Sequence, residues 1–331
     1  MRFLPALSCL FLLAAVADVS HAAPARVSEA GREDHVPVGE RLSRIERILW
    51  ERDTGGIPLL REWAVKDESD KVRERAVGAL VTLRDVGASQ IYTDLLATDS
   101  SPRVRRAAAD AIGTLSIRVD RPERLTDPLR KDADPFVRAV CARTIARTGL
   151  RETFPYLLTA LVQDPSPEVR ALSADALSTL RVTEAAGVLK TSAVQDPSVL
   201  VRVYSIRALA AIVPRDSTEL FRTVWEQAVE EELRLEAYQG LLLSLEPDAW
   251  VNTGLRDKDP QVRFLAFRKW ESLHIKKRPG DRPPRNSAVV LQLESFLKDP
   301  LRGIREGAKL TLEKIGYRVV ETGGAYSIAG D

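Results

Sequence analysis

The residues of this sequence best suited to chemistry are aspartate and arginine pairs that recur at one spacing. In the stretch DPSPEVR, for example, Asp164 stands six residues before Arg170. A carboxylate held beside a guanidinium could bind a charged substrate or tune a proton-transfer group. The pair recurs in seven places, however, and a catalytic residue is not usually needed seven times. The repetition favours a structural role.

We therefore interpret the pairs as a structural ladder between repeated units. Each carboxylate would accept hydrogen bonds from turn amides and from the arginine of its own or the next unit. Arginine suits this role because its planar fork bridges two acceptors and stays charged. The predicted ladder comprises Asp67, Arg73, Asp99, Arg105, Asp132, Arg138, Asp164, Arg170, Asp196, Arg202, Asp257, Arg263, Asp299 and Arg305. One further unit contains Arg234 but has Ala228 in place of the aspartate.

Other residues that could catalyse a reaction or bind a metal are few. The three histidines are His21, His35 and His274, and none forms a His-x-x-x-His pair or joins a cysteine cluster. A glycine-rich phosphate loop and a Gly-x-Ser-x-Gly elbow are both missing from the sequence. Cys141 falls in the apolar register of a helix, which predicts a packed and unreactive thiol. We expect no catalytic residue, no metal and no cofactor.

The pairs belong to units that repeat about every 32 residues. The arginines fall at Arg73, Arg105, Arg138, Arg170, Arg202, Arg234, Arg263 and Arg305, in steps of 32, 33, 32, 32, 32, 29 and 42. Before each turn is a short amphipathic helix, and after it a second helix, which in several units begins with proline. In that second helix the aliphatic residue before the arginine, the fourth residue after it and the eighth share one face. The fourth is always small and the eighth always large and apolar, so the three form a buried stripe.

The pattern D-x-x-x-x-[VLI]-R-x-x-[small]-x-x-A-L resembles HEAT-type repeats, particularly the short HEAT-like repeats of phycobiliprotein lyase subunits. The resemblance covers roughly Gly55 to Ile315. It implies an all-α fold, a right-handed α-solenoid (armadillo/HEAT-type superhelix) of about eight two-helix repeats. It implies little about chemistry, because such repeats serve lyases, adaptors, regulators and DNA-repair proteins alike. The metal-binding HEAT-like hydroxylases carry His-Glu pairs, and no histidine here is followed by glutamate.

The ends of the chain differ from the repeats. Residues 1–22 combine Arg2, an apolar run and a small-x-small end, which predicts a secretory signal peptide. We expect a flexible leader at 23–38, the solenoid at 39–317 and a C-terminal tail at 318–331. A helix from Glu40 is expected to cap the first repeat. The predicted location is the bacterial periplasm, with an extracellular location as the alternative, and no later segment is apolar enough to span a membrane.

The solenoid's inner face is where we expect a protein partner. The second helix of each unit should line the concave side, and its outward column contains Val203, Leu235 and Phe264 in three successive units. Arg207 and Arg268 would border this apolar ridge. Exposed apolar surface of this kind is typical of an interaction site. The alternative is that superhelical curvature buries the column.

A second candidate surface is the basic, proline-rich insertion at 274–287 that causes the step of 42. Its candidate residues are Lys276, Lys277, Arg278, Arg282 and Arg285. Insertions in repeat proteins often map to functional loops, so this one could contact an acidic partner or an anionic surface. The alternative is a solvated connector.

These observations predict an exported, non-catalytic protein-interaction scaffold or adaptor. The net charge of +2 indicates no particular class of partner. Together with the predicted signal peptide it argues against nucleic acid as a partner. The alternative function is that of a lyase or isomerase resembling the bilin-chromophore lyases, which rests on the repeat resemblance alone.

Overall fold

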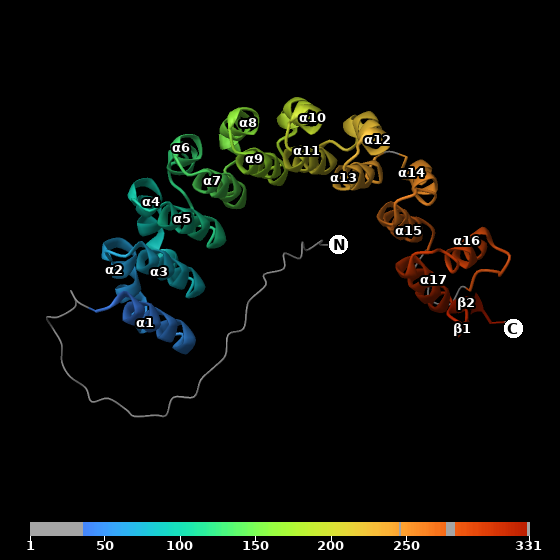
Figure 1. The fold of residues 1–331 in the computed structure, drawn as a ribbon, viewed down its shortest axis with the longest axis horizontal. Coiled ribbons are helices and arrows are strands. Elements are labelled where there is room, and N and C mark those ends of the chain that lie inside the picture. Colours follow the sequence, from blue (N-terminus) through green and yellow to red (C-terminus); the bar gives the residue numbers. More distant parts are fainter. Residues whose placement is uncertain (1–35, 245, 276–281, 330–331) are drawn as a thin grey trace.

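The described part of the chain forms an arch of eight consecutive helical hairpins (Figure 1). The computed structural model describes residues 36–244, 246–275 and 282–329. The first helices of the hairpins form the outer layer of the arch, and the second helices form the inner, concave layer. The predicted all-α solenoid of eight two-helix units is therefore confirmed.

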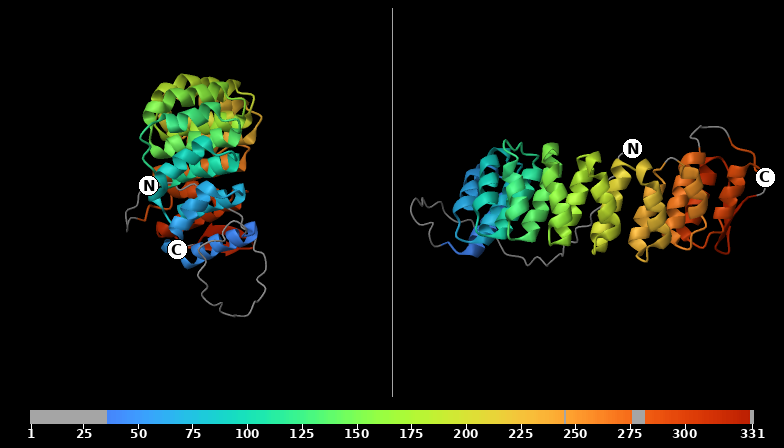
Figure 2. Two further views of the ribbon diagram at one scale, coloured as in Figure 1. Left: turned by 90° about the vertical axis from the view of Figure 1, so that its left-hand side faces the viewer. Right: turned by 90° about the horizontal axis from the view of Figure 1, so that it is seen from above.

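The outer helices are α2 (Ile57–Lys66), α4 (Ser89–Thr98), α6 (Glu123–Lys131), α8 (Phe154–Gln163), α10 (Ala186–Gln195), α12 (Thr218–Gln227), α14 (Pro247–Gly254) and α16 (Ala288–Phe296). The inner helices are α3 (Asp70–Thr82), α5 (Pro102–Thr114), α7 (Pro135–Thr148), α9 (Pro167–Thr179), α11 (Val199–Ile212), α13 (Glu231–Leu241), α15 (Pro260–His274) and α17 (Arg302–Lys314). All of them lie across the arch, side by side along its length (Figure 2).

Proline and the apolar stripe explain where the inner helices begin and what they bury. Helices α5, α7, α9 and α15 begin at a proline, whose missing amide costs nothing in the first turn. The small residue of the stripe is fully buried in every unit, and the large apolar residue is buried as well. The small side chains allow adjacent helices to approach closely, so one core continues along the whole arch. The small positions are Ala76, Ala108, Cys141, Ser173, Ser205, Ala237, Ala266 and Ala308.

Helix α1 (Val38–Glu51) extends the inner layer at its N-terminal end and packs on α3, as predicted for a capping helix. Ile45 is fully buried in this contact, so the first repeat is covered on its open side. The predicted signal peptide and nearly all of the predicted leader lie outside the described residues. None of the helices that the structure describes is long and apolar enough to cross a membrane.

The C-terminal segment differs from its prediction as a tail. It forms a β-hairpin of β1 (Val319–Thr322) and β2 (Ala325–Ile328), paired antiparallel with Thr322 opposite Ala325. Gly323 and Gly324 both have positive φ, of 61° and 82°, which a tight two-residue hairpin turn requires and glycine adopts freely. Ile328 is buried, so the hairpin packs on the last repeat.

Candidate functional site

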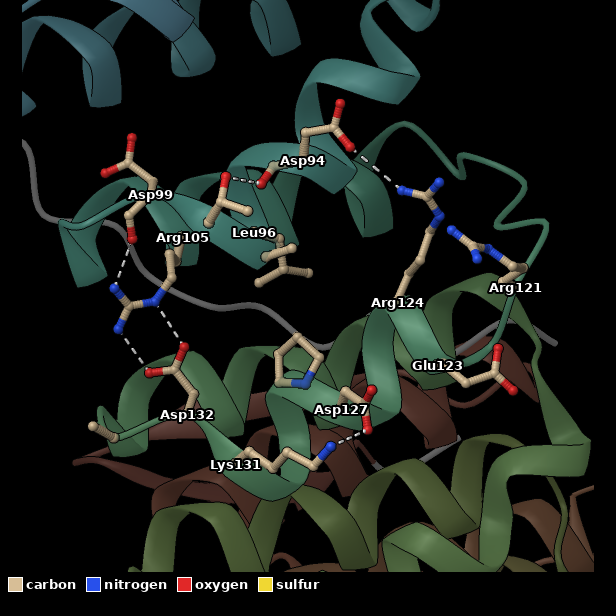
Figure 3. Close-up of a pocket in the computed structure, with 14 residues that line it drawn as sticks. Asp94, Leu96, Asp99, Arg105, Arg121, Glu123, Arg124, Asp127, Lys131 and Asp132 are labelled. Atoms are coloured by element: carbon tan, nitrogen blue, oxygen red, sulfur yellow. Dashed lines mark hydrogen bonds and ion pairs between the residues drawn. The ribbon is translucent and has the colours of Figure 1, made fainter.

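The repeated arginines form a ladder along the turns. In the four rungs from Arg73 to Arg170, Nε and Nη2 of the arginine donate to the two oxygens of an aspartate in the next unit. Nη1 of the same arginine donates to turn carbonyls of its own unit. For Arg138, the two bonds to Asp164 are both 2.8 Å long, and Nη1 lies 2.9 Å from the carbonyl oxygen of Asp132. Figure 3 shows the equivalent rung at Arg105.

Each aspartate of the ladder is also held by its own turn. The Asp164 carboxylate accepts a hydrogen bond from the amide of Ser166 at 2.9 Å, and the other turns repeat this bond. The hydrogen bonds to Asp164 hold the pKa of Arg138 above its usual value. The prediction paired each carboxylate with the arginine of its own or the next unit, and the structure corrects this. Each carboxylate pairs with the arginine of the preceding unit. The arginine of its own unit donates from Nη1 to backbone carbonyls of that turn, and its Nε and Nη2 face the following unit.

The ladder begins one rung earlier than the sequence pattern indicated. Arg41 of α1 forms an ion pair with Asp67 at 2.9 Å, and both side chains are largely buried. A sequence signal for this residue exists, since Arg41 stands 26 residues before Asp67, as Arg73 stands before Asp99. At the other end Arg305 binds its own turn, with Nη1 at 2.8 Å from the carbonyl oxygen of Asp299, and has no further rung among the described residues.

The rungs loosen toward the C-terminus. The four from Arg73 to Arg170 have Nε to carboxylate distances of 2.7–2.8 Å. At Ala228 the aspartate is missing, and Nη2 of Arg202 donates to Glu230 at 2.5 Å instead. Beyond it, the closest approach is 3.2 Å for Arg234 and Asp257, and 3.6 Å for Arg263 and Asp299.

The exposure of the predicted concave column changes in the same part of the arch, between α11 and α13. Val203 is fully buried, so its prediction as a partner-binding residue is wrong. It lies on α11, which packs closely between α9 and α13 and leaves this column no room to reach solvent. Leu235 is half-buried, and Phe264 is 37% exposed because α13 and α15 pack less closely.

Leu235 and Phe264 belong to a small apolar groove on the concave side between α13 and α15. We call it the inner groove, and its cavity volume is about 250 Å³. Its lining is Leu235, Gln239, Pro260, Gln261, Phe264, Leu265 and Leu301. Leu301 comes from the turn before α17, so three successive units contribute to the groove. Leu235 and Phe264 are the two members of the groove that the sequence column contained, and the sequence did not identify Pro260, Gln261, Leu265 or Leu301.

The arginines predicted to border the groove are paired on the surface. Arg207 forms an ion pair with Glu236 and lies over the ring of Tyr204, 5.1 Å from its centroid. Arg268 forms an ion pair with Glu271 at 2.9 Å. The border of the groove is therefore not basic as expected, because glutamates on the inner helices balance the charge of both arginines. The sequence column did not include these glutamates.

The insertion after α15 is only partly described. Lys276, Lys277 and Arg278 lie outside the described residues. Arg282 stacks on Tyr317 with its guanidinium carbon 4.2 Å from the ring centroid, and Arg285 lies 3.5 Å from the carboxylate of Glu294. These two arginines were predicted as candidate contacts for an acidic partner. In the structure they contact their own chain and hold the end of the loop against the last unit.

A larger, charged groove of about 740 Å³ lies between α4 and α6 in the outer layer. Most of its charges are paired within the protein (Figure 3). Lys131 lies 3.0 Å from Asp127, and Arg124 lies 3.6 Å from Asp94. The Arg105 rung closes one end of the groove. Because the carboxylates and cations satisfy one another, this groove offers an incoming charged ligand less than its size suggests.

Metal-binding and nucleophilic side chains are the remaining candidates for chemistry in the part of the chain that the structure describes. Over these residues, no group of three histidine, cysteine, aspartate or glutamate side chains could hold a metal ion. Cys141 is fully buried, and burial raises the pKa of its thiol. A thiol kept protonated in an apolar core is a packed small residue and a poor nucleophile.

Comparisons with known proteins agree with this geometry. A family model described as HEAT repeats matches residues 47–120 and 122–197. The curated proteins yielded no match. Among solved structures, YibA of Escherichia coli is 19% identical, with a TM-score of 0.51 over 72% of this chain and 89% of that one. This likeness supports the solenoid fold and nothing finer.

Two further solved structures are similar at lower scores. The complex of CpcE and CpcF of phycocyanin lyase from Nostoc sp. PCC7120 is 15% identical, with a TM-score of 0.45 over 88% of this chain and 99% of that one. An engineered protein is 18% identical, with a TM-score of 0.43 over 56% of this chain and 95% of its own.

Proposed function

Because this chain carries HEAT repeats, we propose that it is a non-catalytic protein-interaction scaffold whose inner groove binds a partner protein. The observation that carries the proposal is the apolar lining of the inner groove on the concave face. An aromatic ring in a shallow apolar depression is the kind of residue on which protein interfaces concentrate their binding energy.

The chemistry of the groove favours a peptide segment with an apolar side chain. Leu235, Leu265 and Phe264 offer apolar contact, and burying a leucine side chain fully contributes about 2 kcal/mol. Gln239 and Gln261 stand among these apolar residues, and each amide can both donate to and accept from a peptide backbone. The groove thus combines an apolar pocket with polar groups able to orient a chain.

Site-specific crosslinking tests the proposal. A photo-crosslinking residue would replace Gln239, which lines the groove without being part of the buried core. We expect it to capture a defined protein in the native envelope. The substitution Leu235→Asp in the same chain should abolish capture. A crosslinker at Val162, exposed on the outer helix α8, is the matched control. Equal capture at both positions would contradict a specific groove.

Export to the periplasm is part of the proposal and has its own test. Cell fractionation of the full-length chain should recover a shortened product in the periplasm if residues 1–22 are cleaved.

A bilin titration distinguishes the scaffold from the lyase alternative. An absorbance change or a retained chromophore on the purified chain would favour the lyase over the scaffold.

A further inference from the structure

The gap in the ladder lies beside a cavity. Ala228 stands six residues before Arg234, where the other units have an aspartate. A cavity of about 490 Å³ lies between the outer helices α10 and α12, and Ala228 and Arg202 both line it. The cavity is in the outer layer, separate from the inner groove.

Arg202 faces this cavity with an incomplete set of hydrogen bonds. Its side chain is 16% exposed. Nη1 donates to the carbonyl oxygen of Asp196 at 3.0 Å, and Nη2 donates to Glu230. In the preceding rung, Nε of Arg170 donates to an aspartate at 2.8 Å. Nε of Arg202 has no such acceptor among the described residues. Nε of Arg202 therefore keeps a free donor on a guanidinium that is otherwise largely enclosed, and a carboxylate there would form a charge-assisted hydrogen bond.

The charged groove shows what the same location looks like when the rung is complete. Measured from the arginine of the following unit, Asp132 corresponds to Ala228, Lys131 to Gln227 and Asp127 to Thr223. Three charged side chains are thus replaced by small or neutral ones around Arg202. Only the loss of the aspartate is specific to this unit, because two other units also have a glutamine and a threonine at the positions of Gln227 and Thr223.

Apolar side chains form the remaining wall of the cavity. Val194 is 59% exposed, Leu220 is half-buried and Val224 is nearly buried. Two acidic residues also line the cavity, and both are paired: Glu219 with Arg222 at 2.6 Å, and Glu230 with Nη2 of Arg202. A ligand for this site therefore needs one carboxylate for Arg202 and a short apolar group beside it.

We propose that this cavity binds the carboxyl terminus of a partner chain that ends in an aliphatic residue. The terminal carboxylate takes the place of the missing aspartate and accepts a hydrogen bond from Nε of Arg202. The aliphatic side chain, attached to the same Cα, packs on Leu220 and Val224. An internal acidic residue fits less well, because it brings unpaired backbone amides against the apolar wall.

Calorimetric titration of the full chain with three short peptides tests this site. The probes are acetyl-Gly-Ala-Leu with a free carboxylate, the same peptide with an amidated terminus, and acetyl-Gly-Asp-Leu with an amidated terminus. We expect the free acid to bind the unaltered chain at least tenfold more tightly than either amide. Ala228→Asp should weaken the free acid at least tenfold, because the new carboxylate occupies Arg202.

The same variant provides a readout that does not depend on the ligand. Ala228→Asp completes a rung, so its melting temperature should rise, whereas Ala228→Ser should neither raise it comparably nor weaken the free acid tenfold. Failure of the free acid to bind, or equal binding to the Ala228→Asp chain, would overturn the proposal. Tighter binding of the aspartate peptide would overturn the assignment to a carboxyl terminus. A lowered melting temperature in Ala228→Asp would contradict the claim that position 228 is a missing rung of the ladder. None of these outcomes depends on the inner groove.

Discussion

Arg170 and Asp196 are 26 residues apart in sequence and are joined by two hydrogen bonds, of 2.8 and 2.9 Å. The same guanidinium donates to the carbonyl oxygen of Asp164 in its own turn at 3.0 Å. One side chain thus ties the turn of one unit to the turn of the next. Repeated along the arch, this relationship fixes how far each unit can rotate against its neighbour.

Arg170→Ala should destabilise the solenoid without affecting partner binding. The substitution leaves the carboxylate of Asp196 largely buried without its guanidinium, and breaking a buried pair in this way costs about 3 kcal/mol. Chemical denaturation would measure the loss. Arg222→Ala, which removes an exposed pair with Glu219, is the control and should leave stability unchanged. If the folded Arg170→Ala chain kept its stability but lost binding, the ladder would have a functional role instead.

The ladder also predicts a dependence on pH. Burial opposes the charge of Asp196, but the hydrogen bonds from Arg170 and from the Ser198 amide outweigh burial and lower its pKa. A lowered carboxylate pKa adds stability above the unfolded value of about 3.9, and this stability is lost as the pH falls through the folded pKa. Asp196→Asn should therefore be less stable than the unaltered chain at pH 6, and the difference should shrink below pH 4. Denaturation series at several pH values would measure it. A difference that widened in acid would contradict this assignment.

Glycines on the inner helices give a prediction with opposite signs at two sites. A Cβ on Gly307 would lie 2.6 Å from the ring of Phe267, which is fully buried, so Gly307→Ala should cost about 1–3 kcal/mol. A Cβ on Gly78 would meet only the end of Arg75, at 3.8 Å. Gly78→Ala should therefore stabilise by about 0.5–1 kcal/mol, as expected for a helix interior. Thermal unfolding of the two variants would test the signs, and a loss of stability in both would contradict the close contact at Gly307.

The sequence predicted the features that every unit repeats, because eight copies of one pattern reveal the register. The buried stripe and the turn pairs follow from that register directly. Features that depend on how adjacent units pack could not be read in the same way. Val203 and Leu235 occupy the same column, yet only Val203 is fully buried, because α11 is packed more closely than α13. Arg41 was missed because α1 lacks the unit pattern.

The inner groove gives the prediction most directly related to function. Phe264→Ala should weaken binding of the partner captured at Gln239 at least tenfold, which corresponds to about 1.4 kcal/mol. Phe264 is 37% exposed and its ring lies near Gly303, 3.4 Å from where a Cβ would stand, so truncation removes groove surface more than core. Its effect on thermal stability should therefore be smaller than that of Arg170→Ala. Val162→Ala removes a more exposed apolar side chain from the outer layer and should leave binding unchanged. Titration of the purified partner against both variants would decide the matter, and equal weakening by both would exclude the inner groove as the binding site.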